Sequence, residues 1–204
     1  MTVVARKPGT PIAKLAHRAG HRCLDFVNSL VATNEPAPRD SLLSPSDYRI
    51  WAGMAGIAVD PQASEPVELA ALNRARELRE SILQILTAML DGKPTPVGAI
   101  EHLTEEAARS FRSRRLAPAD GHLAWQRTYH DLDSVTDLLA AEAAELFSRA
   151  GPLPLKRCID ADCGWFFLDT SRNKSRHWCS MTDCGNRAKA RRHRARQQLE
   201  ECAN

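Results

Sequence analysis

The sequence is poor in aromatic residues and has no long apolar run. Aromatic side chains make up 5% of its 204 residues. No stretch approaches the roughly 18 consecutive apolar residues that a membrane helix needs, and the first residues have no apolar core of signal-peptide length. We therefore expect a soluble, cytoplasmic protein.

Several catalytic motifs are also missing. The chain contains no Gly-rich phosphate loop, no Gly-x-Ser-x-Gly elbow and no His-Glu-x-x-His pair, so nothing points to the nucleotide-binding, hydrolase and metalloprotease classes that use them. Because 43% of the residues are hydrophobic, the chain can bury a core, and its length suits one or two small domains. We expect no enzyme.

Hydrophobic periodicity predicts a mainly helical body. Apolar residues recur at spacings of three and four between residues 66 and 90, and weaker helical patterns cover residues 23–31, 97–110 and 131–149. A further helix begins after Ser44, which can cap its free amides. Two short strands surround the turn at 118–121. Residues expected on buried helix faces include Met54, Met89, Ile100 and Phe111.

Cysteine is concentrated near the C-terminus. The residues Cys158, Cys163, Cys179 and Cys184 form the pattern Cys-x4-Cys-x15-Cys-x4-Cys, while Cys23 and Cys202 stand apart. Two close pairs separated by about 15 residues suit a tetrahedral ion, and four thiolates leave no open coordination position. The spacer predicts a hairpin, with a strand at 165–168, a turn at 170–174 and an extended return at 177–178. With the helix-prone run after Cys184, this is the element order of a treble-clef zinc finger.

Three other interpretations of this cysteine cluster remain. The four thiols can be reduced and metal-free, they can hold an iron–sulfur cluster, or His177 or His193 can replace one of them. We favour one structural Zn²⁺, because a module of about 45 residues cannot easily bury enough surface to fold alone. Binding of structural zinc supplies roughly 10–16 kcal/mol of apparent free energy.

Positive charge gathers in the same region. Residues 151–204 carry 11 Lys and Arg against six Asp and Glu, whereas residues 1–150 carry 17 against 19. Ten consecutive residues hold six cations, and no acid occurs from Asn186 to Leu199. The candidate nucleic-acid-binding residues are Arg187, Lys189, Arg191, Arg192, Arg194 and Arg196 on the helix, extended by Arg172, Lys174 and Arg176 at the hairpin tip.

This basic run has two interpretations, a nucleic-acid-binding surface and a solvated helix face. A charge run is often only a solvated helix face, but its attachment to a zinc module favours nucleic-acid binding. The side chains of Ala188, Ala195, Leu199 and Cys202 trace a stripe that we expect to anchor the helix along one edge. The cations would then face outward.

The C-terminal motifs resemble those of a known family. The segments Cys163-Gly-Trp-Phe-Phe-Leu-Asp-Thr-Ser-Arg-Asn, Arg176-His-Trp-Cys-Ser-Met and Cys184-Gly-Asn-Arg are similar to the CGNR zinc finger. The segment Cys23-Leu-Asp-Phe-Val-Asn-Ser, with Arg39-Asp40 and Trp51, resembles the ABATE domain that accompanies it. The resemblance implies a stress-induced transcription regulator with a zinc-binding treble clef and a helical N-terminal domain that has a groove.

By position, the resemblance makes the four clustered cysteines the ligands and places Arg187 where it contacts DNA or braces the hairpin. It also sets Asp25, Asn28 and Arg39 near the groove, where a small-molecule effector could bind. Helix capping and buried hydrogen bonding are the simpler explanation of these polar residues.

We therefore predict a mainly α fold with a small β component, divided into a helical domain at 1–152 and a treble-clef finger at 153–204. The leading hypothesis is a cytoplasmic DNA-binding regulator. The second is a protein- or RNA-interaction module whose zinc site is purely structural. The third is an enzyme that uses Asp25 and a histidine such as His21 in the groove.

Overall fold

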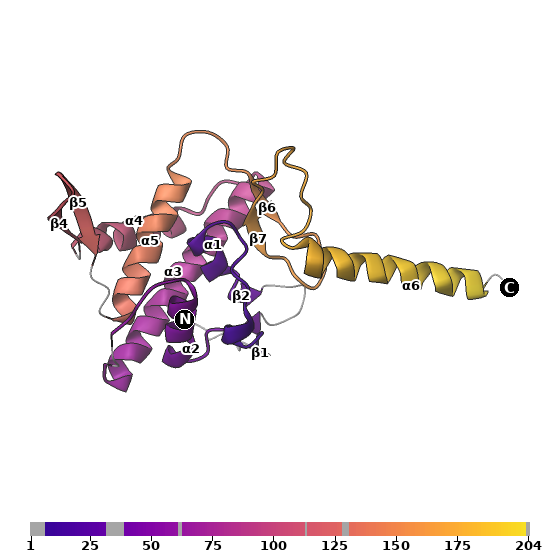
Figure 1. The fold of residues 1–204 in the computed structure, drawn as a ribbon, viewed down its shortest axis with the longest axis horizontal. Coiled ribbons are helices and arrows are strands. Elements are labelled where there is room, and N and C mark those ends of the chain that lie inside the picture. Colours follow the sequence, from indigo (N-terminus) through magenta and orange to yellow (C-terminus); the bar gives the residue numbers. More distant parts are fainter. Residues whose placement is uncertain (1–6, 32–38, 61–62, 113, 128–130, 203–204) are drawn as a thin grey trace.

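The computed structural model describes residues 7–31, 39–60, 63–112, 114–127 and 131–202, and it confirms a mainly helical chain with a small β component (Figure 1). The helices are α1 (Arg22–Val27), α2 (Pro45–Met54), α3 (Glu65–Asp91), α4 (Val97–Arg112), α5 (Leu132–Phe147) and α6 (Asn186–Cys202), with short turns η1 (Ile12–Lys14) and η2 (Met181–Gly185). The strands are β1 (Lys7–Pro8), β2 (Leu30–Val31), β3 (Arg39–Asp40), β4 (Arg114–Ala119), β5 (His122–Arg127), β6 (Leu155–Arg157) and β7 (Phe166–Leu168).

Helices α3, α4 and α5 pack against one another and form the centre of the body. The long helix α3 buries the predicted stripe from Leu72 to Leu86 and ends at Gly92, whose φ of +62° is the left-handed conformation that favours glycine. At the start of α2, Ser44 and Asp47 form a reciprocal capping box. The predicted helices and the cap at Ser44 are thus confirmed, except that the pattern at 23–31 is helical only as far as Val27 and its last two residues form β2.

Four apolar residues predicted to be buried are instead 39–55% exposed: Met54, Met89, Ile100 and Phe111. Helix α4 shows the reason. Its buried side is formed by Ala99, Leu103 and Ser110, and a residue one position further along is rotated by about 100° around the helix. Ile100 and Phe111 are those next residues, so they turn away from the core.

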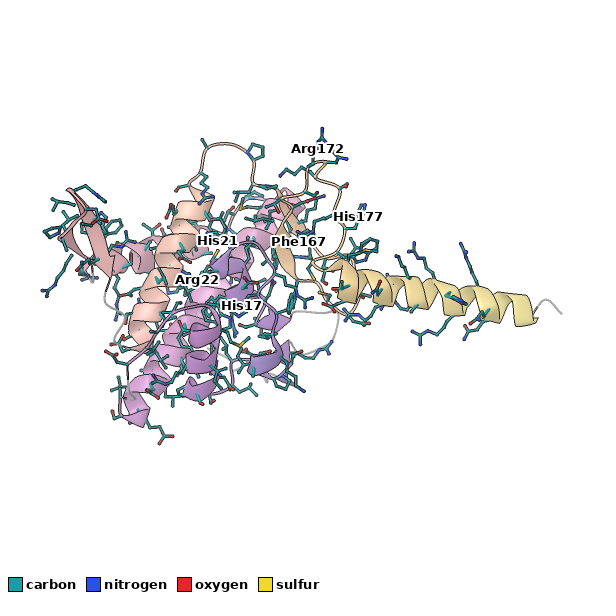
Figure 2. The ribbon with its side chains drawn as sticks, viewed as in Figure 1. His17, His21, Arg22, Phe167, Arg172 and His177 are labelled. Atoms are coloured by element: carbon teal, nitrogen blue, oxygen red, sulfur yellow. The ribbon has the colours of Figure 1, made fainter. Side chains whose placement is uncertain are left out.

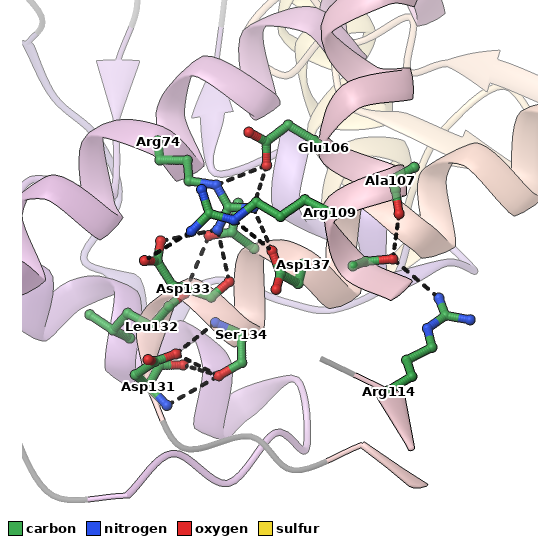
Figure 3. Close-up of polar contacts among 12 residues, drawn as sticks. Arg74, Glu106, Ala107, Arg109, Arg114, Asp131, Leu132, Asp133, Ser134 and Asp137 are labelled. Carbon is green, nitrogen blue, oxygen red and sulfur yellow. Dashed lines mark hydrogen bonds and ion pairs between the residues drawn. The ribbon is translucent and has the colours of Figure 1, made fainter. Parts of the chain in front are cut away.

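A partly buried polar cluster joins the three central helices (Figure 3). Arg74 on α3 donates from Nε to Glu106 Oε2 on α4 at 2.8 Å and from Nη1 to Asp133 Oδ1 on α5 at 3.0 Å. It also pairs with Asp137. Burial alone would lower the pKa of Arg74, but hydrogen bonds to these carboxylates raise it above its usual value. One arginine therefore fixes the relative positions of three helices.

The strands form three small sheets. The first has the order β1-β3-β2, with β1 parallel and β2 antiparallel to β3. The second is the predicted hairpin of β4 and β5, and the third pairs β6 with β7. None of the helices in the described parts of the chain combines the length and apolarity needed to cross a bilayer.

Candidate metal centre and basic helix

The four predicted cysteine ligands meet at one point. The sulfur atoms of Cys158, Cys163, Cys179 and Cys184 all lie within 4.8 Å of one another, and all four residues are buried. The Sγ atom of Cys179 is 3.6 Å from those of Cys163 and Cys184. Four thiolates at a Zn–S distance of about 2.3 Å around one tetrahedral ion would lie about 3.8 Å apart. The spacing fits a single ion.

The ionisation of these thiols supports the same conclusion. Hydrogen bonds from Cys163 and Cys179 hold the pKa of Cys158 well below its usual range. Burial and the negative charge of Cys179 raise the pKa of Cys184 above its usual value. Without a cation, the cluster therefore stabilises one thiolate at the expense of its neighbours. A divalent ion removes this conflict, because four thiolates can then share it.

The sulfur spacing and the donor set bear on two of the alternatives raised by the sequence, an iron–sulfur cluster and a histidine ligand. In a cubane cluster each thiolate binds a different iron, which would keep the sulfur atoms further apart than around one ion. Among the described residues, the group able to hold a metal contains the four cysteines and no histidine. The donor set is that of one structural zinc ion.

The path of the chain through this module differs in one respect from the prediction. Strand β7 pairs with β6, which precedes Cys158, rather than with a returning strand at 177–178. The first cysteine pair thus lies in the turn of the β6–β7 hairpin, and Gly164 in that turn has a φ of +67°. The second pair leads through η2 into α6. The Ile159 amide donates to the His177 carbonyl at 3.1 Å, which links these two halves beside the cysteine site.

The start of α6 is fixed to the first cysteine pair by a carboxylate. The side chain of Asp160 is fully buried and accepts from Arg187 Nε at 2.9 Å and Arg191 Nη2 at 2.6 Å. Arg187 also donates from Nη2 to Cys184 Sγ at 3.0 Å. Burial would raise the pKa of Asp160, but its hydrogen bonds from Arg191 and Arg187 hold that pKa below its usual range. No local pattern in the sequence indicates this contact, because Asp160 lies 27 residues before Arg187.

Beyond this contact, α6 projects away from the body (Figure 1). The predicted anchoring stripe is wrong where it can be tested, since Ala195 is exposed and Ala188 only half-buried; the side chains of Leu199 and Cys202 lie outside the described ones. The helix is held at its first turns by salt bridges instead. The other cations among the described residues of this helix are all exposed: Lys189, Arg192, Arg194 and Arg196.

The three cations predicted to extend the basic surface have different settings. Arg172 is exposed at the outer tip of the loop after β7 (Figure 2). Lys174 is exposed, and its carbonyl accepts from Lys156. Arg176 is half-buried, donates to the Cys179 carbonyl at 2.7 Å and lies 4.7 Å from the Phe167 ring centre. Arg176 therefore supports the zinc module, while Arg172 and Lys174 face solvent.

Two of the predicted groove residues attach the zinc module to the body. Asn28 is buried, accepts from the Phe166 amide and donates to the Phe166 carbonyl, each at 2.9 Å. Asp25 Oδ1 accepts from the amides of Arg18 and Ala19 at 2.9 and 3.0 Å, and the Ala19 carbonyl accepts from the amide of β7 residue Leu168 at 2.8 Å. Asn28 thus makes the buried hydrogen bonds that the simpler explanation expects, whereas Asp25 is half-buried and accepts from backbone amides nearer the surface.

Family comparisons match both parts of the chain. Residues 155–197 match the CGNR zinc finger. Residues 20–150 match ABATE, described as "Putative stress-induced transcription regulator". The chain belongs to the ABATE family. No curated protein matches the sequence.

The ABATE region and the CGNR finger share one hydrophobic core. Buried residues from α1, such as Leu24 and Phe26, belong to the same cluster as Phe166 and Phe167 of β7. Arg18 also reaches the finger, where it donates to Ser180 Oγ at 2.9 Å and pairs with Asp183. The finger is therefore packed against the ABATE body, and the boundary predicted between residues 152 and 153 stays a prediction.

Arg39, the third predicted groove residue, lies in another place. It lines a cavity of about 360 Å³ where the N-terminal segment of the ABATE body meets the finger. Lys14 and Arg18 line the same cavity, as do Trp165 and Arg187 of the finger. A cavity of this size can hold a small molecule. Asp25 lines another cavity, with His17 and His21, and the groove predicted for Asp25, Asn28 and Arg39 stays a prediction.

Replacing Asn28 with Ala should weaken the attachment of the CGNR finger. The change leaves the buried amide and carbonyl of Phe166 without their partner, which costs about 1–3 kcal/mol in the free energy of unfolding. Urea titration measures the change, with the exposed residue Asn73→Ala as the matched control. Equal stabilities for the two variants would contradict the role given to Asn28.

Proposed function

We propose that this chain is a cytoplasmic DNA-binding transcription regulator in which zinc fixes the start of α6 and α6 contacts nucleic acid. The family descriptions support a regulatory role. The proposal gives the chain a binding role, not a catalytic one, because the zinc ligands are four thiolates that leave no open position for a reactant.

The cationic stripe on α6 is the observation that carries this proposal. Lys189, Arg192 and Arg196 follow one another at spacings of three and four, so they share one side of the helix. Arg187 and Arg191, which bind Asp160, lie on the opposite side. The contact with the finger therefore orients the stripe toward solvent. Arginine side chains in such an array suit phosphate oxygens and guanine edges.

The energetics of α6 also favour a polyanionic partner. The part of α6 beyond its contact with Asp160, residues 192–202, is only marginally stable in water when nothing packs on it, because an isolated helix shorter than about 12–15 residues is marginal. The stripe places like charges three and four residues apart, which destabilises a helix further. A phosphate backbone would neutralise that repulsion. We expect the helical content of the full chain, measured by circular dichroism, to rise when duplex DNA is added at low salt.

Replacing Arg192 and Arg196 with Ala should weaken DNA binding roughly hundredfold at about 0.1 M salt. Each phosphate contact contributes about 0.9 to the slope of log K against log salt concentration. Loss of two contacts should therefore flatten that slope by about 1.8. Fluorescence anisotropy with a labelled duplex at several salt concentrations measures both effects.

The matched control removes the same charge elsewhere. Lys93 and Arg149 are exposed residues of the body, outside the finger and α6. A Lys93→Ala, Arg149→Ala variant should bind DNA almost as the parent does. If both double variants lose the same affinity, only net charge matters, and the role of the α6 stripe is wrong.

The alternative of an RNA- or protein-interaction module is tested with the same variants. Single-stranded and duplex RNA of matched length replace DNA in the titration. The proposed function predicts tighter binding to duplex DNA. A preference for RNA that depends on Arg192 and Arg196, or no binding to either polymer at low salt, would favour the alternative.

The proposal further gives the ABATE body a sensing role, with the effector in the cavity beside Arg39. The cavity adjoins Cys184 and Arg187 at the start of α6, so a bound molecule would contact the residues that fix the helix. A thermal-shift screen of small metabolites, repeated with Lys14→Ala, tests this role. Stabilisation that disappears in the variant would locate the effector there. Stabilisation that is equal in both proteins would contradict it.

A further inference from the structure

The β4–β5 hairpin exposes one apolar face. Opposite residues of an antiparallel pair share a face, and the register pairs Leu116 with Trp125 and Pro118 with Leu123. Leu116, Leu123 and Trp125 are 53–65% exposed, as is Phe111 at 55%, whose ring lies edge-on to Trp125 at 6.5 Å. We call these residues, with Pro118, the hairpin patch. It extends well beyond the scattered apolar residues usual on a monomer.

The described elements leave this hairpin with little support. Strands β4 and β5 contact each other extensively, whereas no described helix makes comparable contact with either. Arg114 reaches back to Ser110 on α4, at 3.4 Å (Figure 3). Figure 1 shows the hairpin at the end of the molecule opposite α6. An isolated two-stranded hairpin is only marginally stable in water, so its apolar face gains most from a second layer.

We propose that a second copy of this chain covers the hairpin patch, so that the protein forms a symmetric dimer through its hairpins. The charges at the two ends of the hairpin favour a second copy of this chain as the partner. Its base carries Arg112 at the end of α4 and Arg114, which shares the face of Leu116, and its tip carries the exposed acid Asp120. A two-fold axis that sets each tip over the partner's base places Asp120 beside these arginines twice. If the two hairpins lay parallel, each tip would face the partner's tip and each base the partner's base, so like charges would meet.

The size of the patch sets the strength of the dimer. Four large side chains that are each about half exposed offer roughly 400 Å² per copy, against the roughly 800 Å² per partner of a stable interface. The dimer should therefore be weak, with a dissociation constant in the micromolar range. This inference is independent of the proposed DNA binding, because the patch and α6 share no residue.

Sedimentation equilibrium of the full chain over about 1–200 µM tests the dimer, a range centred on the micromolar affinity expected for a small interface. The parent should pass from monomer to dimer in this range, and Leu123→Glu should remain a monomer. Val97→Glu is the matched control, because Val97 is 67% exposed at the start of α4 outside the patch. A parent that stays monomeric throughout, or a dimer that Leu123→Glu leaves intact, would overturn the proposal.

A charge exchange separates dimer loss from a misfolded hairpin. Asp120→Arg sets arginine against arginine and should weaken the dimer at least tenfold. Adding Arg114→Asp to the same chain restores opposite charges across the two-fold axis and should recover most of the affinity. Failure of the double variant to associate better than Asp120→Arg alone would contradict the antiparallel arrangement.

Discussion

A Cys163→Ala variant of the full chain will lose its zinc ion and the ordered structure of the finger. Three remaining thiols cannot complete the tetrahedral shell that the quartet provides. The lost binding free energy is about 10–16 kcal/mol for structural zinc sites of this class. This matches or exceeds the total stability of a typical domain, so the finger cannot remain folded by packing alone.

Loss of the zinc ion should also affect α6 and the ABATE body, which both contact the finger. Helix α6 loses the contact between Asp160 and Arg187, because the first cysteine pair no longer holds Asp160 in place. The ABATE body keeps its three central helices but loses the partner of Asn28, and its melting temperature should fall by several degrees. Native mass spectrometry measures the loss of the zinc ion, and circular dichroism measures the helix content and the melting temperature. Cys202→Ser, outside the quartet, is the control and should retain one zinc ion.

A second large effect is expected from a fully buried ion pair of the body. Arg79 on α3 and Asp40 on β3 are fully buried, with Arg79 Nη1 2.9 Å from Asp40 Oδ1 and Nη2 2.5 Å from Oδ2. Arg79→Met leaves the Asp40 carboxylate buried without this cation. Breaking one side of such a pair costs about 3–5 kcal/mol, or a fall of roughly 6–20 °C in melting temperature for a chain of this size.

The double variant Arg79→Met, Asp40→Asn distinguishes the cost of an isolated charge from the value of the pair. Removing both charges avoids the buried unpaired carboxylate. The amide oxygen of the new asparagine can still accept from the Leu42 amide, as the Asp40 carboxylate does at 2.9 Å. The double variant should therefore be more stable than Arg79→Met. Urea denaturation measures both, and a single variant that loses less than about 1 kcal/mol would contradict this description of the core.

The features that are predictable from the sequence are those set by nearby residues. Helix periodicity, the cap at Ser44 and the cysteine spacing each act within a few turns or within one metal shell, so the pattern of residue types specifies them. The exposed positions of Ile100 and Phe111 escape prediction because α4 packs through the adjacent residues Ala99 and Ser110. A rotation of one residue is too small for periodicity alone to resolve.

The features that escape sequence-based prediction depend on contacts between distant residues. No acid occurs within the arginine run, from Asn186 to Leu199, yet Asp160 binds two of its members. The sequence predicts a strand at 165–168 that pairs with the later segment at 177–178. The structure instead pairs β7 with the preceding strand β6, and Asn28 bonds to β7. Asp25 and Asn28, three residues apart, share one side of the turn at α1. This spacing hints at the attachment of the finger, but it can be interpreted only once the structure is known.

The most direct test of the account is a salt-dependent DNA titration of the full chain before and after removal of zinc with a chelator. We predict binding that weakens steeply with salt while zinc is present, is lost on chelation and returns when one equivalent of Zn²⁺ is restored. DNA binding that is equally strong in the metal-free protein would show that the zinc ion does not organise α6 for nucleic acid, and would contradict the account.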